Sequence, residues 1–271
     1  GLAGAAGGIV FGLSVLTMPA LPVAFGAGLT ALGFGCAAAY LRHVRKVAVP
    51  LIAPSLFRIP TYAAAIYAGS FFRVAVGATP FLLPLMLQLG FGMTAFESGM
   101  VTCVIAIGAL SVKFGVAKLY RRIGFRVSLT AAIIVTCATI AAMGFFTPST
   151  SLIFMFGVLI LTGFTRSTFF TGVNALTYAD VPPEDASQAT AMSAVAQQVS
   201  LALGVAFAAG ILELRILFAG TSLTLADFHM AFFIIAAVGL IAVVFTLRLP
   251  ADAGASVSGH QRAGVQPSSG A

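Results

Sequence analysis

Long apolar runs, separated by short polar or basic segments, set the pattern of this chain. Eight runs stand out, at residues 2–19, 22–41, 60–88, 95–117, 127–146, 151–173, 189–213 and 229–248. Each comes close to or exceeds the roughly 20 residues that carry a helix across the ~30 Å hydrocarbon layer of a membrane. None shows the strict alternation of a membrane β-barrel. The pattern predicts an all-α integral membrane protein.

Composition agrees with this prediction. The chain is 60% hydrophobic and 8% charged, and its mean hydropathy is +1.08, whereas about a quarter of the residues of a soluble domain are charged. It opens at Gly1, already inside an apolar run and without a signal peptide. We interpret this opening as the start of a fragment of a longer protein.

The net charge of +7 is explained by topology. Most of the 14 Lys and Arg residues fall in segments 42–59 and 118–126 and in the tail from Arg248, whereas segments 89–94, 147–150 and 214–228 contain only Arg215. Short cytoplasmic loops carry such an excess of positive charge. The sequence therefore predicts a multi-pass protein of the cell membrane with a cytoplasmic C-terminus. No basic face with interleaved aromatic residues indicates a nucleic-acid partner.

Cysteine and histidine offer no metal or cofactor site. Cys36, Cys103 and Cys137 lie far apart inside apolar runs, and no histidine has a ligand partner at helical spacing. We expect the three cysteines to be small, buried helix residues. Phosphate-binding loops and sets of catalytic residues are also missing from the sequence, so nothing indicates an enzyme.

Arg73 is the first candidate for a functional side chain. It lies near the middle of run 60–88, where a full charge costs about 2.5–3.5 kcal/mol on insertion scales. Such residues usually face a cavity or a partner charge. Arg73 could line a central cavity and bind an anionic group or pair with a carboxylate. The alternative is a structural arginine that donates hydrogen bonds to carbonyls of neighbouring helices.

A polar stripe on the sixth run provides further candidates for a substrate pathway. Arg166, Phe170 and Asn174 follow one another at intervals of four residues, with Thr171 beside them. Gln88 ends run 60–88, and Gln197 and Gln198 are adjacent glutamines in an apolar run, where they need hydrogen-bond partners. Either contact with substrate or bonding between helices would explain each of these side chains.

Carboxylates, by contrast, keep to the ends of the runs. Asp180, Glu184 and Asp185 precede run 189–213, where we expect them to cap the N-terminus of its helix. No Asp or Glu falls in the middle of a run, although a proton-coupled transporter needs a protonatable group in its pathway. If the protein uses protons, that group is expected in a part of the protein that precedes this chain.

An ordered series of short motifs resembles one known family of transporters. The series comprises Pro50-Leu51-Ile52, Ser55-Leu56-Phe57-Arg58, Phe81 to Gln88, Gly90-Phe91-Gly92, Asn174 to Thr177, Asp180 to Ala186, and Gln197-Gln198 followed by Gly204-Val205-Ala206. It resembles the major facilitator superfamily, and within it the fourteen-helix drug:proton antiporter-2 branch, over about residues 50–210. The resemblance implies a six-helix C-terminal bundle at 60–249, preceded by two extra transmembrane helices at 1–41 and a cytoplasmic loop at 42–59. Residues 250–271, rich in Gly, Ser and Ala, are expected to form a disordered cytoplasmic tail.

One loop departs from the family pattern. Members of the family carry a form of G-x-x-x-D-R-x-G-x-R between the second and third helices of such a bundle. Here Arg121 stands at the Asp position and Ala117 at the leading Gly, while Arg122, Gly124 and Arg126 match. The resemblance gives that Asp a role in latching neighbouring helices, so the substitution at Arg121 puts this latch in question, while the basic half of the motif fits a cytoplasmic loop.

The resemblance implies export of small, lipophilic compounds by proton-coupled antiport with alternating access. The expected partners are a small-molecule substrate, protons, the lipid bilayer and a six-helix N-terminal bundle that the chain lacks. Two alternatives remain open: a non-transporting remnant or interaction module, and a membrane enzyme or channel subunit.

Overall fold

The structure is a computed structural model that describes residues 35, 54–112, 115–220, 223–250 and 253. The two helices predicted at 1–41 lie outside the described residues, apart from residue 35. So do residues 42–53 of the predicted loop and nearly all of the predicted tail. Within the described part every regular element is helical, which confirms the all-α prediction.

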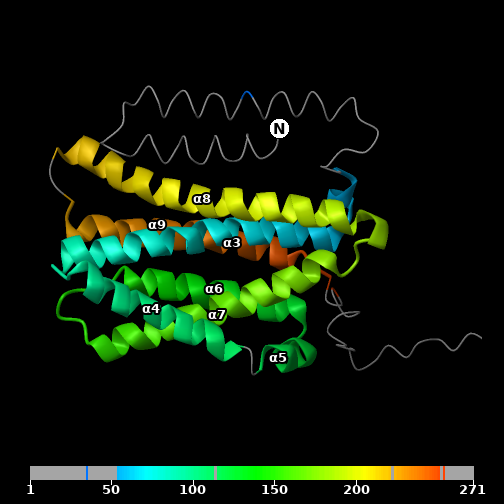
Figure 1. Cartoon of the computed structure of the whole chain (residues 1–271), viewed down its shortest axis with the longest axis horizontal. Helices are drawn as coiled ribbons and strands as arrows, with labels where there is room; N and C mark the ends of the chain where they lie inside the picture. The colour runs from blue at the N-terminus through cyan, green and yellow to red at the C-terminus, as the bar shows by residue number, and fades with distance from the viewer. Residues whose placement is uncertain (1–34, 36–53, 113–114, 221–222, 251–252, 254–271) are drawn as a thin grey trace, which may run out of the picture.

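Six long helices run side by side (Figure 1): α3 Pro60–Leu85, α4 Ala95–Ser111, α6 Phe125–Met143, α7 Leu152–Tyr178, α8 Ala186–Ala219 and α9 Leu225–Leu247. Of these, α3 with its continuation to Gly90, α6, α7, α8 and α9 are long and apolar enough to cross a membrane. Helix α4 is also apolar but has only 17 residues. The predicted membrane class is therefore confirmed.

Helix α3 lies at the centre of the bundle. It packs most extensively against α8 and α9 and also contacts α7, while α4 packs on α7, and α6 on both α7 and α9. Pro60 at its first turn favours helix initiation, because proline has no N–H to leave unbonded there. Pro80 and Pro84 lie inside the helix, where each removes a backbone hydrogen bond. The chain then continues as the π-helical turn η2, Met86–Gly90.

Two clusters of buried apolar side chains stabilise the two halves of the bundle's length. One, toward the Gln88 end of α3, includes Leu82, Met86, Phe146, Phe228 and Phe232; the other, toward the Pro60 end, includes Phe72, Tyr120, Phe125, Leu129 and Phe169. Hydroxyl groups join the helices between these clusters, as in the contact of Thr136 with Thr165 at 2.7 Å. Most other buried threonines donate to a carbonyl of their own helix, which satisfies the hydroxyl in an apolar setting.

Helices α4 and α7 touch through their backbones at two glycines. A Cβ atom added at Gly163 would overlap the carbonyl oxygen of Ile105, and one added at Gly108 would overlap the carbonyl oxygen of Ile160. Small residues at such positions let membrane helices approach closely. This reciprocal contact sets the separation of α4 from α7.

Several helix boundaries differ from those predicted. Helices α7 and α8 are longer than runs 151–173 and 189–213, because polar residues such as Asn174 and Arg215 continue a helix as readily as apolar ones. Helix α8 ends only at Gly220, whose φ of 63° closes it in the left-handed conformation. The segment predicted as loop 118–126 instead contains a short amphipathic helix, α5 Val116–Ile123, in which Tyr120 is buried and the basic residues are exposed.

The predicted capping of α8 by carboxylates is wrong in its detail. Asp185 occupies the N-cap position, but its side chain makes no capping hydrogen bond. Its φ of −95° and ψ of −6° lie in the helical region, whereas a capping side chain usually needs extended backbone. Asp180 instead accepts a hydrogen bond from the hydroxyl of Thr61 at 2.7 Å, and so joins the ends of α7 and α3.

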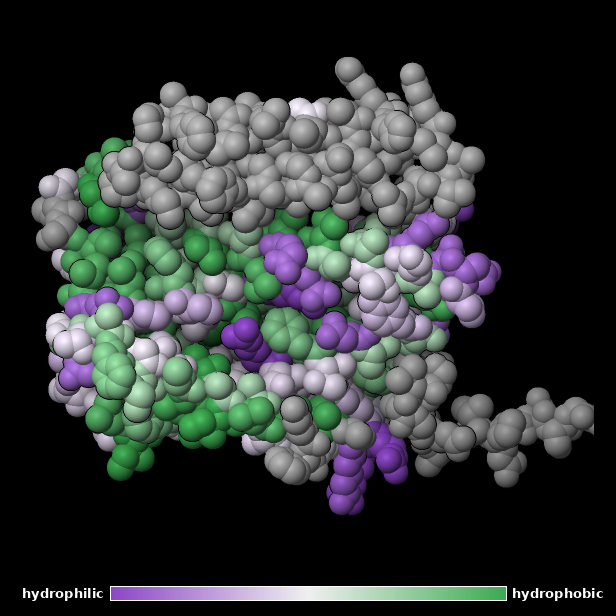
Figure 2. Space-filling model, viewed as in Figure 1, coloured by the Kyte–Doolittle hydropathy of each residue, from purple (hydrophilic) through white to green (hydrophobic). Residues whose placement is uncertain are grey.

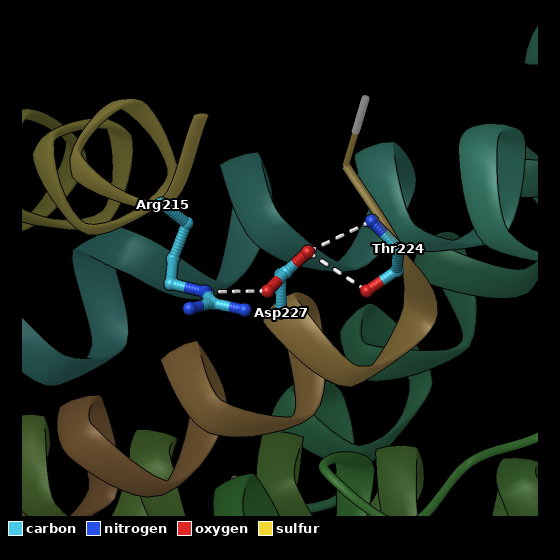
Figure 3. Close-up of polar contacts among 3 residues, drawn as sticks. All are labelled: Arg215, Thr224 and Asp227. Carbon is cyan, nitrogen blue, oxygen red and sulfur yellow. Dashed lines mark hydrogen bonds and ion pairs between the residues drawn. The ribbon is translucent and has the colours of Figure 1, made fainter. Parts of the chain in front are cut away.

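Carboxylate caps occur at α4 and α9. Thr94 with Glu97, and Thr224 with Asp227, each form a capping box. Asp227 accepts hydrogen bonds from the backbone N–H and the hydroxyl of Thr224 at 2.9 and 2.8 Å. It also pairs with Nε of Arg215 on α8 at 2.6 Å (Figure 3). One buried carboxylate therefore ties the start of α9 to the end of α8.

Replacing Asp227 with alanine should lower the free energy of unfolding by about 2 kcal/mol, because a buried acceptor of three hydrogen bonds is lost. Unfolding in mixed SDS micelles would measure the change. Glu97→Ala is the matched control, since Glu97 occupies the same position in an exposed capping box without an arginine. Equal losses in the two variants would show that Arg215 contributes nothing to stability.

Candidate functional site

A cavity of about 630 Å³ opens between α3, α4 and α7, about halfway along the bundle. Its lining residues come from these three helices: Thr79, Pro80, Leu83, Pro84, Thr102, Cys103, Ile105, Ala106, Ala109, Arg166, Ser167, Phe170, Thr171 and Asn174. The volume lies in the range of small-molecule sites. Figure 2 shows hydrophilic residues across the middle of an otherwise largely hydrophobic face, at the level of α3 and α7.

The walls of the cavity differ in character. Helices α3 and α4 contribute mainly proline and aliphatic side chains, whereas α7 contributes a guanidinium, two hydroxyls, an amide and an aromatic ring. On α7 the residues Arg166, Phe170 and Asn174 fall on one face at intervals of four. The structure therefore brings the predicted candidates Arg166, Thr171 and Asn174 together on one wall.

Two guanidinium groups lie near the ring of Phe170. Cζ of Arg166 is 5.8 Å from the centroid of its ring, and Cζ of Arg73, from α3, is 5.0 Å from the same centroid. Both distances allow a cation–π interaction. Phe72 holds the ring from α3 by an edge-to-face contact, with centroids 5.7 Å apart. Arg73 does not line the cavity itself, but it reaches the ring that does.

Neither arginine has a carboxylate partner in the described part of the chain. Arg73 is only 6% exposed, and Arg166 is half-buried. The ion pair of Arg215 with Asp227 is the one salt bridge among the described residues. A buried charge without a partner is costly, since neither water nor a counter-ion compensates its desolvation. The site thus carries an excess of positive charge.

The remaining pathway candidates lie away from this cavity. Gln88 donates a hydrogen bond from Nε2 to Oγ of Ser98 at 3.0 Å, which joins turn η2 to α4. Gln197 is half-buried and Gln198 exposed on α8, and neither contributes to the cavity wall. Neither forms a hydrogen bond with another described residue.

The basic motif forms one corner of the bundle. Arg121 and Arg122 end α5, and Gly124, with φ of 81°, allows the chain to turn directly into α6, where Arg126 lies in the first turn. Tyr120 anchors the corner by donating a hydrogen bond from its hydroxyl to the carbonyl of Thr168 on α7 at 2.7 Å. Burial raises the pKa of this phenol above its usual range, so it stays protonated.

Sequence reasoning missed part of the site. Cys103, expected to be buried, is exposed and lines the cavity, whereas Cys137 is buried as expected. Thr79 and Thr102 also line it, although no periodic polar pattern in runs 60–88 or 95–117 marks them. Which face of α4 lines the cavity becomes clear only once the packing of α4 on α7 is known.

Comparison with known proteins identifies the relatives of this chain. A model of the family described as Major Facilitator Superfamily matches residues 68–269. A protein named "Putative multidrug resistance protein MdtD" from Klebsiella pneumoniae is 31% identical over 248 residues, covering 84% of this chain and 49% of the relative. One with the same name from Citrobacter koseri is 32% identical over 215 residues, covering 74% and 44%.

A third relative has a broader name. "Probable transport protein HsrA" from Haemophilus influenzae is 28% identical over 208 residues, covering 77% of this chain and 44% of the relative. The chain thus spans about half the length of the curated relatives it matches.

Proposed function

Because the chain belongs to the major facilitator superfamily of membrane transporters, we propose that it supplies the C-terminal half of an exporter of small, lipophilic compounds. The cavity between α3, α4 and α7 carries this proposal, since it is large enough for an organic molecule and lies about midway along the helices. Substrate sites of such transporters lie near the membrane midplane, between two bundles that alternately open to each side. The names of the MdtD relatives favour export of drug-like compounds.

The other half of the site belongs to an N-terminal six-helix bundle in this proposal. The relatives are about twice as long as the matched region, which leaves room for a second bundle. Residues 1–41 would form the two extra helices of the fourteen-helix branch, residues 42–59 a cytoplasmic loop, and residues 250–271 a cytoplasmic tail.

Orientation in the cell membrane follows from the distribution of charge. Arg58, Arg122, Arg126 and Arg248 lie near the end of the bundle where α3 begins, whereas Arg215 is near the opposite end. The positive-inside rule then places the first end in the cytoplasm. Protons are proposed as the coupling ion, with the protonatable carboxylate in the N-terminal bundle, since no described Asp or Glu lines the cavity.

Transport in inside-out vesicles tests this proposal. Vesicles from cells that make the complete gene product should accumulate at least one of two permanently charged probes, naphthalene-2-sulfonate or (2-naphthylmethyl)trimethylammonium. Permanent charge prevents passive trapping by a pH gradient. Nigericin and valinomycin together, in a potassium medium, collapse both the pH gradient and the membrane potential, and should reduce accumulation to the level of control vesicles.

Two results would contradict parts of the proposal. If neither this pair nor a wider panel of lipophilic probes moved in the presence of folded protein, the chain would be better described as a non-transporting remnant or interaction module. Accumulation that persists when both ionophores are present would exclude coupling to the proton gradient and leave transport itself intact.

A further inference from the structure

We propose that the ligand of this cavity is an amphiphilic organic anion, whose acidic group binds to α7 and whose apolar body lies against α3 and α4. The inference rests on the proposed transport function and specifies its substrate class. It follows from three features of the cavity: uncommitted hydrogen-bond donors, uncompensated positive charge and a separate apolar wall.

The donors come from one face of α7. The guanidinium of Arg166, the hydroxyl of Ser167 and the carboxamide of Asn174 all line the cavity. None of them forms a hydrogen bond with another described residue. A guanidinium presents N–H groups that match the two oxygens of a carboxylate or sulfonate. These three groups therefore form a donor set that lacks an acceptor among the described residues.

The electrostatics favour an anion over a cation. Cζ of Arg73 and Cζ of Arg166 both lie within 6 Å of the centroid of the Phe170 ring, so two positive charges lie close to one aromatic residue of the cavity wall. The described carboxylates lie at or near helix ends, and no carboxylate lies on the wall. A cation would meet repulsion from both guanidiniums, whereas an anion would supply the counter-charge that they lack.

The part of the wall from α3 and α4 suits an apolar body. Leu83 and Pro84 of α3 and Ile105 and Ala109 of α4 line the same cavity as the donor set, but on the other two helices. The ring of Phe170 adds an aromatic surface next to the guanidinium of Arg166. A small aromatic or branched hydrocarbon group fits a cavity of about 630 Å³. Donors and positive charge on α7, together with apolar side chains on α3 and α4, therefore favour a ligand with an acidic group and an apolar body.

Equilibrium binding to the purified complete protein tests the inference with three probes of similar shape. Naphthalene-2-sulfonate is the anion, naphthalene-2-sulfonamide its neutral analogue and (2-naphthylmethyl)trimethylammonium the cation. We expect the sulfonate to bind at least about tenfold more tightly than either of the others, as one charge-assisted interaction implies. Arg166→Gln should reduce sulfonate affinity to that of the sulfonamide and leave sulfonamide affinity unchanged.

The controls separate the possible failures. Arg215→Gln removes an arginine outside the cavity and should preserve the preference for the anion. Preference for the cation, or an unchanged anion preference in Arg166→Gln, would overturn the inference; the second result is expected if Arg166 pairs with a carboxylate of the preceding bundle. In the vesicle assay, transport of either the sulfonate or the ammonium probe supports the proposed function. Transport of the ammonium probe alone would therefore overturn this inference and leave the proposed function standing. Binding of none of the probes would overturn the inference, and failure of all transport as well would overturn both.

Discussion

Replacing Gly163 with alanine is expected to lower the free energy of unfolding by about 3 kcal/mol and to abolish transport. The added Cβ would overlap the carbonyl oxygen of Ile105, a backbone atom that no rotamer change can move. Overpacking of this kind usually costs about 1–3 kcal/mol, and the cost is highest where backbone must shift. Helix α4 would move away from α7, and the cavity between them would lose its shape.

Two other glycines provide matched controls for this prediction. Gly157 lies on the same helix and Gly99 on α4, and a Cβ at either would meet nothing within 4 Å. Gly157→Ala and Gly99→Ala should therefore be neutral or slightly stabilising, because alanine is the better helix former. Gly108→Ala should resemble Gly163→Ala, since its Cβ would overlap the carbonyl oxygen of Ile160. Unfolding in mixed micelles together with vesicle transport would check all four variants. Similar behaviour of Gly157→Ala and Gly163→Ala would refute close packing of α4 on α7.

Arg73→Gln is expected to reduce transport about tenfold or more while the amount of folded protein stays unchanged. Arg73 is buried near the middle of α3 and has no hydrogen bond or ion pair with a described residue. Its removal therefore breaks no hydrogen bond or ion pair among the described residues. What is lost is a positive charge next to Phe170 and the cavity. A charge-assisted interaction is worth about 1.5–3 kcal/mol, which corresponds to a factor of about ten to a hundred.

Arg73→Lys separates charge from shape in this test. Lysine keeps the positive charge but lacks the planar group that stacks on an aromatic ring, so we expect transport between that of Arg73→Gln and the unchanged protein. Transport would be measured per folded molecule in inside-out vesicles. Loss of folded protein without any change in transport per molecule would assign Arg73 a structural role and contradict the prediction.

Much of the architecture was predictable because the membrane imposes a simple length rule. Runs such as 60–88 and 229–248 had to be helices, since a chain in lipid must satisfy its own backbone hydrogen bonds. The exact ends were less predictable. Helix α8 continues past Arg215 to Ala219, and α5 forms from residues that were predicted to be a basic loop.

The residues of the candidate site were likewise only partly predictable from the sequence. Arg166, Phe170 and Asn174 could be grouped from sequence, because residues four apart on one helix share a face whatever surrounds them. Cys103 and Thr102 could not, since their exposure to the cavity depends on how α4 packs on α7. Gln88 was named for its polarity in an apolar run, yet the structure gives it a hydrogen bond with Ser98 at the end of the bundle.

The sequence by itself determined the membrane class, the helical fold and the polar face of α7, because each depends on composition or on spacing along one helix. Only the tertiary structure decided that Arg73 and Arg166 meet at one aromatic ring and that Gly108 and Gly163 bring α4 against α7. Those contacts join residues far apart in the chain. They are set by the packing of whole helices, which no local pattern of residues specifies.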